Sequence, residues 1–130
     1  MYQRILVAYN GTPESHVALQ ECLKLAPSAN VEVHLLAVVS PPPYLLVGEF
    51  AAAAVLSVEE GLAAEREKMA TELDKGAALL RAGGLQVTPH LEVGEPVSVI
   101  EELAADLQVE LVIVGHSRAK PLALRWWRGT

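Results

Sequence analysis

The chain has little cysteine, few aromatic residues and a shortage of positive charge, and each shortage excludes a class of protein. Its 130 residues include one cysteine, Cys22, which excludes an internal disulfide and a cysteine-rich zinc site. Aromatic residues make up 5% of the chain, so its core must consist of Ala, Val, Leu and Ile. The net charge of −6, from 16 acidic and 10 basic residues, disfavours general nucleic-acid binding.

Long hydrophobic runs and targeting segments are also absent. The first apolar run, residues 5–9, is too short for the hydrophobic region of a secretory signal. The apolar stretch 35–58 is interrupted by prolines 41–43 and by Glu49. No run therefore approaches the roughly 20 apolar residues that a membrane helix needs. We expect a cytoplasmic protein without a membrane segment.

Hydrophobic residues nevertheless make up 52% of the chain. Short apolar runs, as in strands, alternate along the chain with segments in which apolar residues recur at helical spacing. Four short apolar segments are predicted as strands, at residues 4–9, 31–39, 85–93 and 109–114. Helical spacing predicts helices that begin at Thr12-Pro13, run from Ala51 to the glycines at 83–84, and follow Gly94-Glu95-Pro96. We expect one domain over residues 1–130.

This alternation predicts an α/β fold with three α/β/α layers and a doubly wound parallel sheet in strand order 3-2-1-4. Residues 4–9 are continuously apolar, as in a strand buried on both faces, and belong in the centre. Pro89 lies inside the third strand and places that strand at the periphery.

Doubly wound sheets bind ligands beyond the carboxyl ends of the strands, where the winding reverses. Here that point lies between two small polar loops, residues 10–12 and 115–117. The first loop opens a helix, whose free backbone N–H groups form a natural anion site. The chain has no Walker motif, no G-x-G-x-x-G, no H-E-x-x-H and no recognisable Ser-His-Asp set, so we assign no catalytic residue and no metal site.

Two other groups of polar residues have structural interpretations. The four histidines, His16, His34, His90 and His116, fall in different elements and are expected to be structural or solvated. The carboxylates of the long second helix are interspersed with Arg and Lys, which is typical of a solvated face.

The segment after His116 is basic and holds both tryptophans. No acidic residue follows Glu110, and the bases are Arg118, Lys120, Arg125 and Arg128. Two interpretations stay open: the segment binds phosphates, or it is a mobile basic tail.

Three segments together resemble the universal stress proteins. They are residues 5–12 (ILVAYNGT), residues 93–96 (VGEP) with Ile100 and Ala104 after them, and residues 109–115 (VELVIVG). The resemblance implies a Rossmann-like or flavodoxin-like fold of the adenine nucleotide alpha hydrolase type, usually a dimer, of which one branch binds ATP. Family members continue into a further helix and strand, and we expect this final helix and strand to be missing here.

The ATP-binding branch is similar through a glycine motif after the fourth strand. Gly115 matches its first glycine and Gly129-Thr130 its last pair, whereas Arg118, or Ala119 after a one-residue insertion, occupies the place of the second. The resemblance implies that Asn10 replaces an acidic residue that contacts the nucleoside, keeping an acceptor but losing the charge.

On this basis we expect ATP, with or without Mg²⁺, to be bound. The expected binding residues are Ala8, Tyr9, Asn10, Gly11, Thr12, Val38, Val39, Gly115, His116, Ser117, Arg118, Ala119, Gly129 and Thr130. A substitution of Gly115 by Trp is expected to abolish binding and leave the fold intact.

Three functions are compatible with the sequence. The first is a stress-response protein that binds an adenine nucleotide and hydrolyses it slowly at most, since no general base is positioned. The second is a dimerising regulatory module of the same family that binds no nucleotide. The third, least favoured, is an FMN carrier, because the two loops contain no aromatic residue to stack on a flavin.

The fourth strand is expected to lie at the edge of the sheet and to invite pairing with a second chain. It carries a single charge, Glu110, and no proline, so it lacks the usual protection of edge strands. This predicts a homodimer with Trp126 or Trp127 at the interface. The alternative is that both tryptophans fold back over the fourth strand within one subunit.

Overall fold

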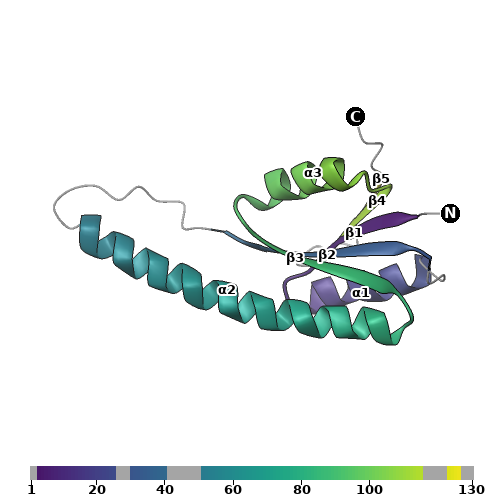
Figure 1. Cartoon of the computed structure of the whole chain (residues 1–130), viewed down its shortest axis with the longest axis horizontal. Helices are drawn as coiled ribbons and strands as arrows, with labels where there is room; N and C mark the ends of the chain where they lie inside the picture. The colour runs from purple at the N-terminus through teal and green to yellow at the C-terminus, as the bar shows by residue number, and fades with distance from the viewer. Residues whose placement is uncertain (1–2, 26–29, 41–50, 116–122, 127–130) are drawn as a thin grey trace.

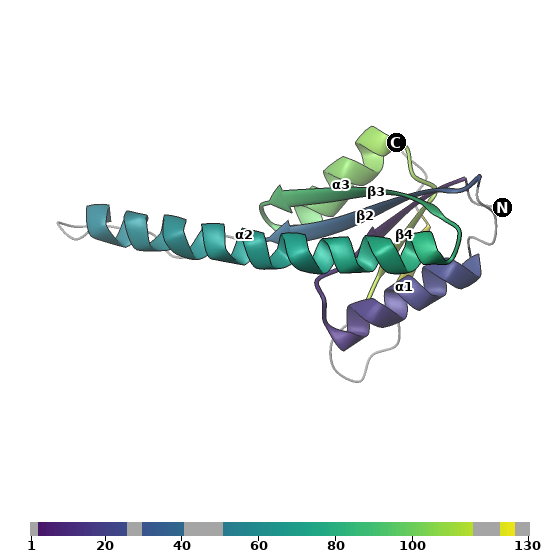
Figure 2. The same ribbon diagram turned by 60° about the horizontal axis from the view of Figure 1, so that its bottom comes forward.

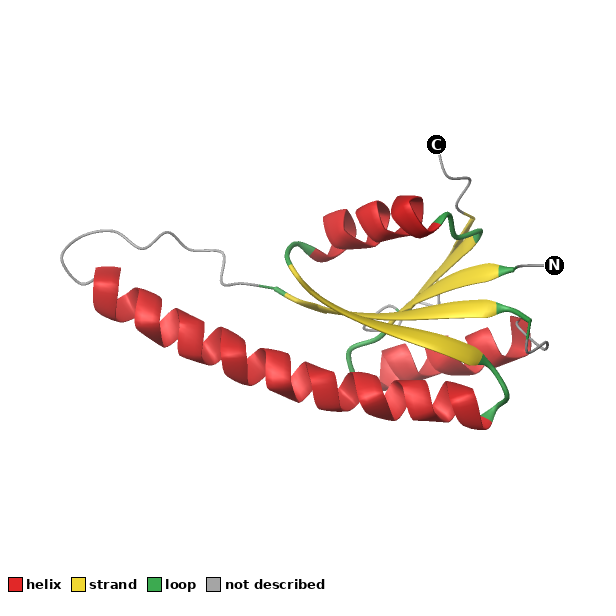
Figure 3. Ribbon diagram, viewed as in Figure 1, coloured by secondary structure: helices red, strands yellow, loops and turns green. Residues whose placement is uncertain are grey.

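The computed structural model describes residues 3–25, 30–40, 51–115 and 123–126. Within these ranges, eight elements follow one another (Figure 1), and Figure 3 separates the helices from the strands. They are β1 (Arg4–Ala8), α1 (Pro13–Leu25), β2 (Glu32–Val39), α2 (Ala51–Ala82), β3 (Gln86–Val93), α3 (Pro96–Leu107), β4 (Leu111–Val114) and β5 (Ala123–Trp126).

The sheet has the strand order β3-β2-β1-β4-β5. The pairs β3–β2, β2–β1 and β1–β4 are parallel, with Ile5 of β1 in register with Val33 on one side and Leu111 on the other. A helix connects each of these strands to the next, as parallel strands require. The predicted parallel sheet in order 3-2-1-4 is therefore confirmed.

The sheet has a fifth strand that the sequence did not predict. β5 pairs antiparallel with β4, from Leu111 opposite Trp126 to Val114 opposite Ala123. The expected exposed edge at the fourth strand is thus wrong, and the argument for a dimer at that edge fails. β5 lies within the basic segment after His116, for which phosphate binding and a mobile tail were the two open interpretations. A strand that pairs antiparallel does not require a crossover helix, so the alternation of helices and strands gives no signal for β5.

The two faces of the sheet carry separate apolar cores. Helices α1 and α2 cover one face and α3 covers the other (Figure 2). Ile5 and Val7 of β1 point into the first core, which also holds Cys22, whereas Leu6 points into the second. All three β1 side chains are fully buried. The predicted α/β/α layering is confirmed, as is the central position of the first strand.

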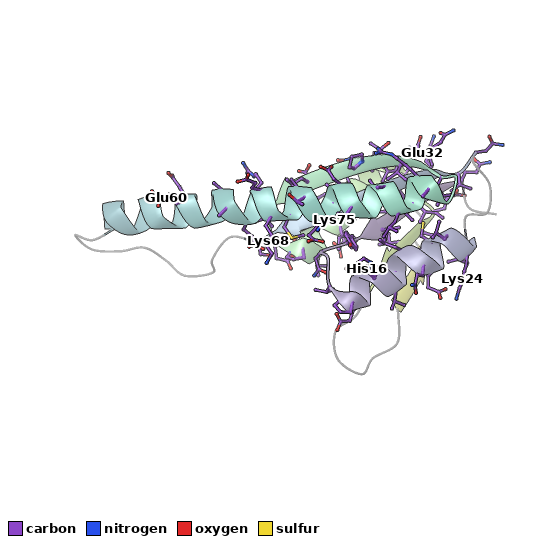
Figure 4. All side chains as sticks on the ribbon, turned by 90° about the horizontal axis from the view of Figure 1, so that it is seen from below. His16, Lys24, Glu32, Glu60, Lys68 and Lys75 are labelled. Carbon is purple, nitrogen blue, oxygen red and sulfur yellow. The ribbon has the colours of Figure 1, made fainter. Side chains whose placement is uncertain are left out.

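Helix α2 packs on the sheet through its C-terminal half. Met69, Leu73, Ala77 and Leu80 recur at helical spacing and are buried in the first core. Toward its N-terminus the helix extends beyond the sheet, and Glu60 and Lys68 project from it (Figure 4). The charged residues between 59 and 68 are exposed, as the interspersed charges predict. Among the described helices, none is long and apolar enough to cross a membrane.

Local signals explain where α3 begins and ends. Glu95 is its N-cap and accepts a 2.8 Å hydrogen bond from the Ser98 N–H, and Pro96 takes the first helical position. That hydrogen bond lowers the pKa of Glu95. The helix ends where Gln108 adopts a left-handed conformation, with φ of 55°. These caps fix the helix that covers the second face of the sheet.

Strand β3 lies at the edge of the sheet, and Pro89 within it is in register with Leu35. A proline cannot donate to a strand ladder, so it is tolerated at this edge. The predicted peripheral position of the third strand is confirmed.

Two histidines that are distant in sequence meet between β2 and β3. His34 Nδ1 lies 2.9 Å from His90 Nε2, and His34 Nε2 lies 2.7 Å from Glu32 Oε2. The carboxylate accepts, so His34 carries its proton on Nε2, and His90 donates to Nδ1 when both rings are neutral. Arg4 lies 3.8 Å from the same Glu32 oxygen. In the described ranges, no three His, Cys, Asp or Glu side chains gather in a group suited to a metal ion.

This pair predicts a loss of stability in mild acid. Burial lowers the pKa of His90, and nearby His34 lowers it further, while Glu92 opposes the shift. A histidine in the unfolded chain has a pKa of about 6.5. The unfolded chain therefore binds more protons just below that pH, and acidification there favours unfolding. Urea midpoints should fall between about pH 7 and pH 5.5, and His90→Gln should reduce this fall. If the urea midpoints of the parent and of His90→Gln depend equally on pH, His90 is not the cause of the acid sensitivity.

Candidate functional site

A cavity of about 170 Å³ lies at the carboxyl ends of β1 and β4. Five elements contribute to its lining: the ends of β1, β2 and β4, and the beginnings of α1 and α3. The lining residues are Ala8, Tyr9, Asn10, Ser15, Leu36, Val38, Pro96, Ile100, Val114 and Gly115. The cavity lies where the winding of the sheet reverses, because α1 leaves β1 toward one face and α3 reaches β4 across the other.

The cavity has an apolar wall and a polar end. Leu36 and Val38 of β2 face Ile100 of α3, and all three belong to the core on the α3 face. Asn10, Ser15 and Gly115 form the polar end, close to the first turn of α1. An apolar slot with a few polar groups at one end is the usual composition of a small-molecule site.

The loop between β1 and α1 satisfies many of its own hydrogen bonds. Asn10 Oδ1 accepts from the Thr12 N–H at 3.1 Å and from Thr12 Oγ1 at 2.6 Å. Thr12 Oγ1 in turn accepts from the Ser15 N–H at 3.3 Å, which confirms Thr12 as the N-cap. The His16 N–H donates to the Thr12 carbonyl at 3.0 Å. Several of the backbone donors expected to bind an anion are therefore already occupied.

Tyr9 anchors this loop to the layer of helices α1 and α2. Its side chain is 3% exposed, and its hydroxyl lies 3.0 Å from His16 Nε2. Helix α2 passes so close that a Cβ on Gly76 would lie 2.9 Å from Tyr9 Cε2. Burial raises the pKa of Tyr9, and the nearby negative charge of Glu72 adds to the effect. The hydroxyl therefore stays protonated and has a structural role.

Gly115 lets the end of β4 approach the first turn of α1. A Cβ at this position would overlap the carbonyl oxygen of Glu14 and lie 2.7 Å from its carbonyl carbon. The expectation that a Gly115→Trp chain keeps its fold is therefore wrong, since even a methyl group meets backbone. Glycine is required here by packing within the chain, whether or not a ligand approaches.

The structure gathers part of the predicted site. Ala8, Tyr9, Asn10, Val38 and Gly115 line the cavity. Gly11 and Thr12 belong to the adjacent loop, where Gly11 has a φ of +82°, but they do not line the cavity. Val39 is buried in the other core, on the face of the sheet that α1 and α2 cover. The remaining predicted residues, His116, Ser117, Arg118, Ala119, Gly129 and Thr130, lie outside the described residues.

The sequence-based prediction did not include five of the residues that line the cavity. Most of them follow a sequence pattern that could have identified them. Leu36 shares the parity of Val38 on a strand, so both side chains point to one face. Pro96 and Ile100 lie four residues apart at the start of a helix that follows a strand end. Ser15 follows the N-cap by three residues, and Val114 directly precedes Gly115.

Comparison with known proteins assigns the fold to a family. The model of the universal stress protein family matches residues 1–127. The chain belongs to the universal stress protein family. No curated protein matches it significantly.

Solved structures agree with this assignment at low sequence identity. UspA from Lactobacillus plantarum is 19% identical, with a TM-score of 0.76 over 95% of this chain and 86% of its own. A family member from Burkholderia pseudomallei is 22% identical, with a TM-score of 0.63 over 88% and 82%. A universal stress protein in complex with cAMP is 19% identical, with a TM-score of 0.57 over 85% and 70%. At these identities the likeness shows the fold.

The packing at Gly115 predicts the effect of a single methyl group. Gly115→Ala should lower the free energy of unfolding by about 1–3 kcal/mol, the usual cost of overpacking. Gly61→Ala is a matched control, because its Cβ would meet nothing within 4 Å on the exposed face of α2. The control should instead gain about 0.5–1 kcal/mol from helix propensity. Urea unfolding measures both changes, and a Gly115→Ala chain as stable as the parent would refute the contact.

Proposed function

We propose that this universal stress protein binds an adenine nucleotide, ATP with or without Mg²⁺, in the cavity between β1 and β4. The observation that carries the proposal is the shape of that cavity: an apolar slot between β2 and α3 that ends in the polar loop after β1. The resemblance of the chain to the ATP-binding branch supports it. So does the solved relative that holds cAMP, since it has the same fold.

In this arrangement the base enters between Val38 and Ile100, and the ribose lies near Asn10. The hydrogen bonds within the β1–α1 loop leave few N–H groups for phosphates, so the phosphates extend toward the segment after Gly115. That segment carries Arg118 and Lys120 in the sequence, which suit phosphate charge.

The cavity favours binding over catalysis. Its described lining contains no His, Asp or Glu side chain that could activate water. Its aromatic residue, Tyr9, is held by His16 and packed on α2, so its ring is not available to stack on a flavin. We infer a cytoplasmic stress-response protein that binds its nucleotide as a regulator and turns it over slowly at most.

Calorimetric titration with ATP tests the proposal. The parent chain should bind ATP, and Ile100→Trp should weaken binding by about 5-fold to 150-fold, because the indole fills the slot and forfeits contacts of about 1–3 kcal/mol. Val97→Trp is the matched control on the same helix, since Val97 is 56% exposed and does not line the cavity. It should bind like the parent.

If the parent chain binds no adenine nucleotide, and releases none when it is denatured after purification, the proposal fails. The regulatory module that binds no nucleotide then becomes the better interpretation. Equal affinity of the Ile100→Trp and Val97→Trp chains would instead place the nucleotide outside this cavity.

We further propose that the chain forms a homodimer, now through β5 in place of β4. β5 lies at the end of the strand order, and in the described residues nothing pairs with its outer side. Unpaired edge groups favour strand addition from a second chain. Sedimentation should give twice the chain mass of 13.9 kDa at micromolar concentration. A mass that stays at that of one chain over the whole concentration range contradicts this arrangement.

A further inference from the structure

The amide orientation of Asn10 is fixed by its partners. The Thr12 backbone N–H lies 3.1 Å from the Asn10 side chain and can only donate, so the atom it faces is the oxygen, Oδ1. Thr12 Oγ1 approaches the same oxygen at 2.6 Å, and it receives the Ser15 N–H on its own lone pair. Thr12 Oγ1 also lies 3.3 Å from Ser15 Oγ, but its 2.6 Å contact with Asn10 Oδ1 is much shorter, so its proton is directed to Asn10 Oδ1.

These two contacts use the acceptor capacity of Asn10. A carbonyl oxygen has two lone pairs, and the Thr12 N–H and O–H occupy both. The acceptor expected at Asn10 is therefore already used by Thr12 within the loop. The polar group that Asn10 retains is its Nδ2 amide, which carries two donors and has no partner among the described residues. Asn10 is exposed and lines the cavity.

An aspartate at this position would behave differently toward a ligand. One carboxylate oxygen would keep the turn with Thr12, and the second would present a charged acceptor that needs a donor such as a ribose hydroxyl. Asn10 presents a neutral donor in that place. A hydroxyl, an ether, an ester and a phosphate oxygen all accept from an amide, so the requirement for a ligand donor disappears.

We propose that Asn10 is a specificity-determining residue. Its Nδ2 amide donates a hydrogen bond to an acceptor oxygen on the ribose-phosphate part of the nucleotide. This rests on the proposed function. The ligand class that follows is an adenine nucleotide whose ribose oxygens are free, alkylated or esterified. Replacement of Asn10 by aspartate should restrict the cavity to nucleotides with a free hydroxyl.

The test compares ATP with 2′-O-methyl-ATP and 3′-O-methyl-ATP, which keep the ribose oxygens but lose one donor each. Dissociation constants are measured by calorimetry for the parent chain and for Asn10→Asp. In the parent, each methyl group should change the constant less than about 3-fold. In Asn10→Asp at least one analogue should bind about 10-fold more weakly than ATP or worse, the size of a lost hydrogen bond to a charged group.

Two controls isolate the effect. Steric effects of the methyl groups act in both proteins, so the ratio of the two methylation penalties cancels them. Asn30→Asp adds the same charge at an exposed position beside the amino end of β2, and should keep the penalties of the parent. Asn10→Asp retains an oxygen for Thr12, so its urea midpoint should stay close to that of the parent.

The outcomes separate the two proposals. If the parent loses as much affinity on methylation as Asn10→Asp, Asn10 does not act as the donor and this inference is overturned while nucleotide binding stands. If neither protein binds ATP or the analogues, nucleotide binding itself fails and the inference falls with it. A large penalty confined to Asn10→Asp supports both.

Discussion

The two-sided pairing of β1 is the constraint on which the rest of the structure depends. This strand pairs in parallel with β2 on one side and β4 on the other, and its side chains are buried on both faces. Both neighbours must then be reached by helical crossovers, with α1 leading to β2 on one face and α3 leading to β4 on the other (Figure 2). The helices diverge at the carboxyl end of β1, and the cavity between them is a consequence of this topology.

The loop at that point determines what the cavity can bind. Its hydrogen bonds within residues 10–16 stabilise the start of α1, but they also use donors that an anion would need. The apolar wall from β2 and α3 remains, together with the amide of Asn10 and the close backbone approach at Gly115. The same contacts that order the loop therefore favour a base and ribose in the cavity, with charge recognition further along the chain.

Much of the fold could be predicted because its signals are local. The continuous apolar run of residues 5–9 identified the central strand, and Pro89 identified an edge. β5 could not be predicted in this way, because its pairing of Trp126 with Leu111 depends on a contact between distant segments. The same holds for the His34–His90 pair and for Gly115 against Glu14. In the site, Leu36 was predictable from strand parity, whereas the occupied acceptor of Asn10 required the position of Thr12.

The central claim is that an adenine nucleotide occupies the cavity at the carboxyl end of β1. Backbone amide shifts from ¹H–¹⁵N spectra during an ATP titration test it most directly. The account predicts that the largest shifts occur at Asn10, Val38, Ile100 and Gly115, with little change at His34 or Leu80 on the far part of the sheet and helix layer. No shifts at saturating ATP, or shifts centred on the His34–His90 region, would contradict it.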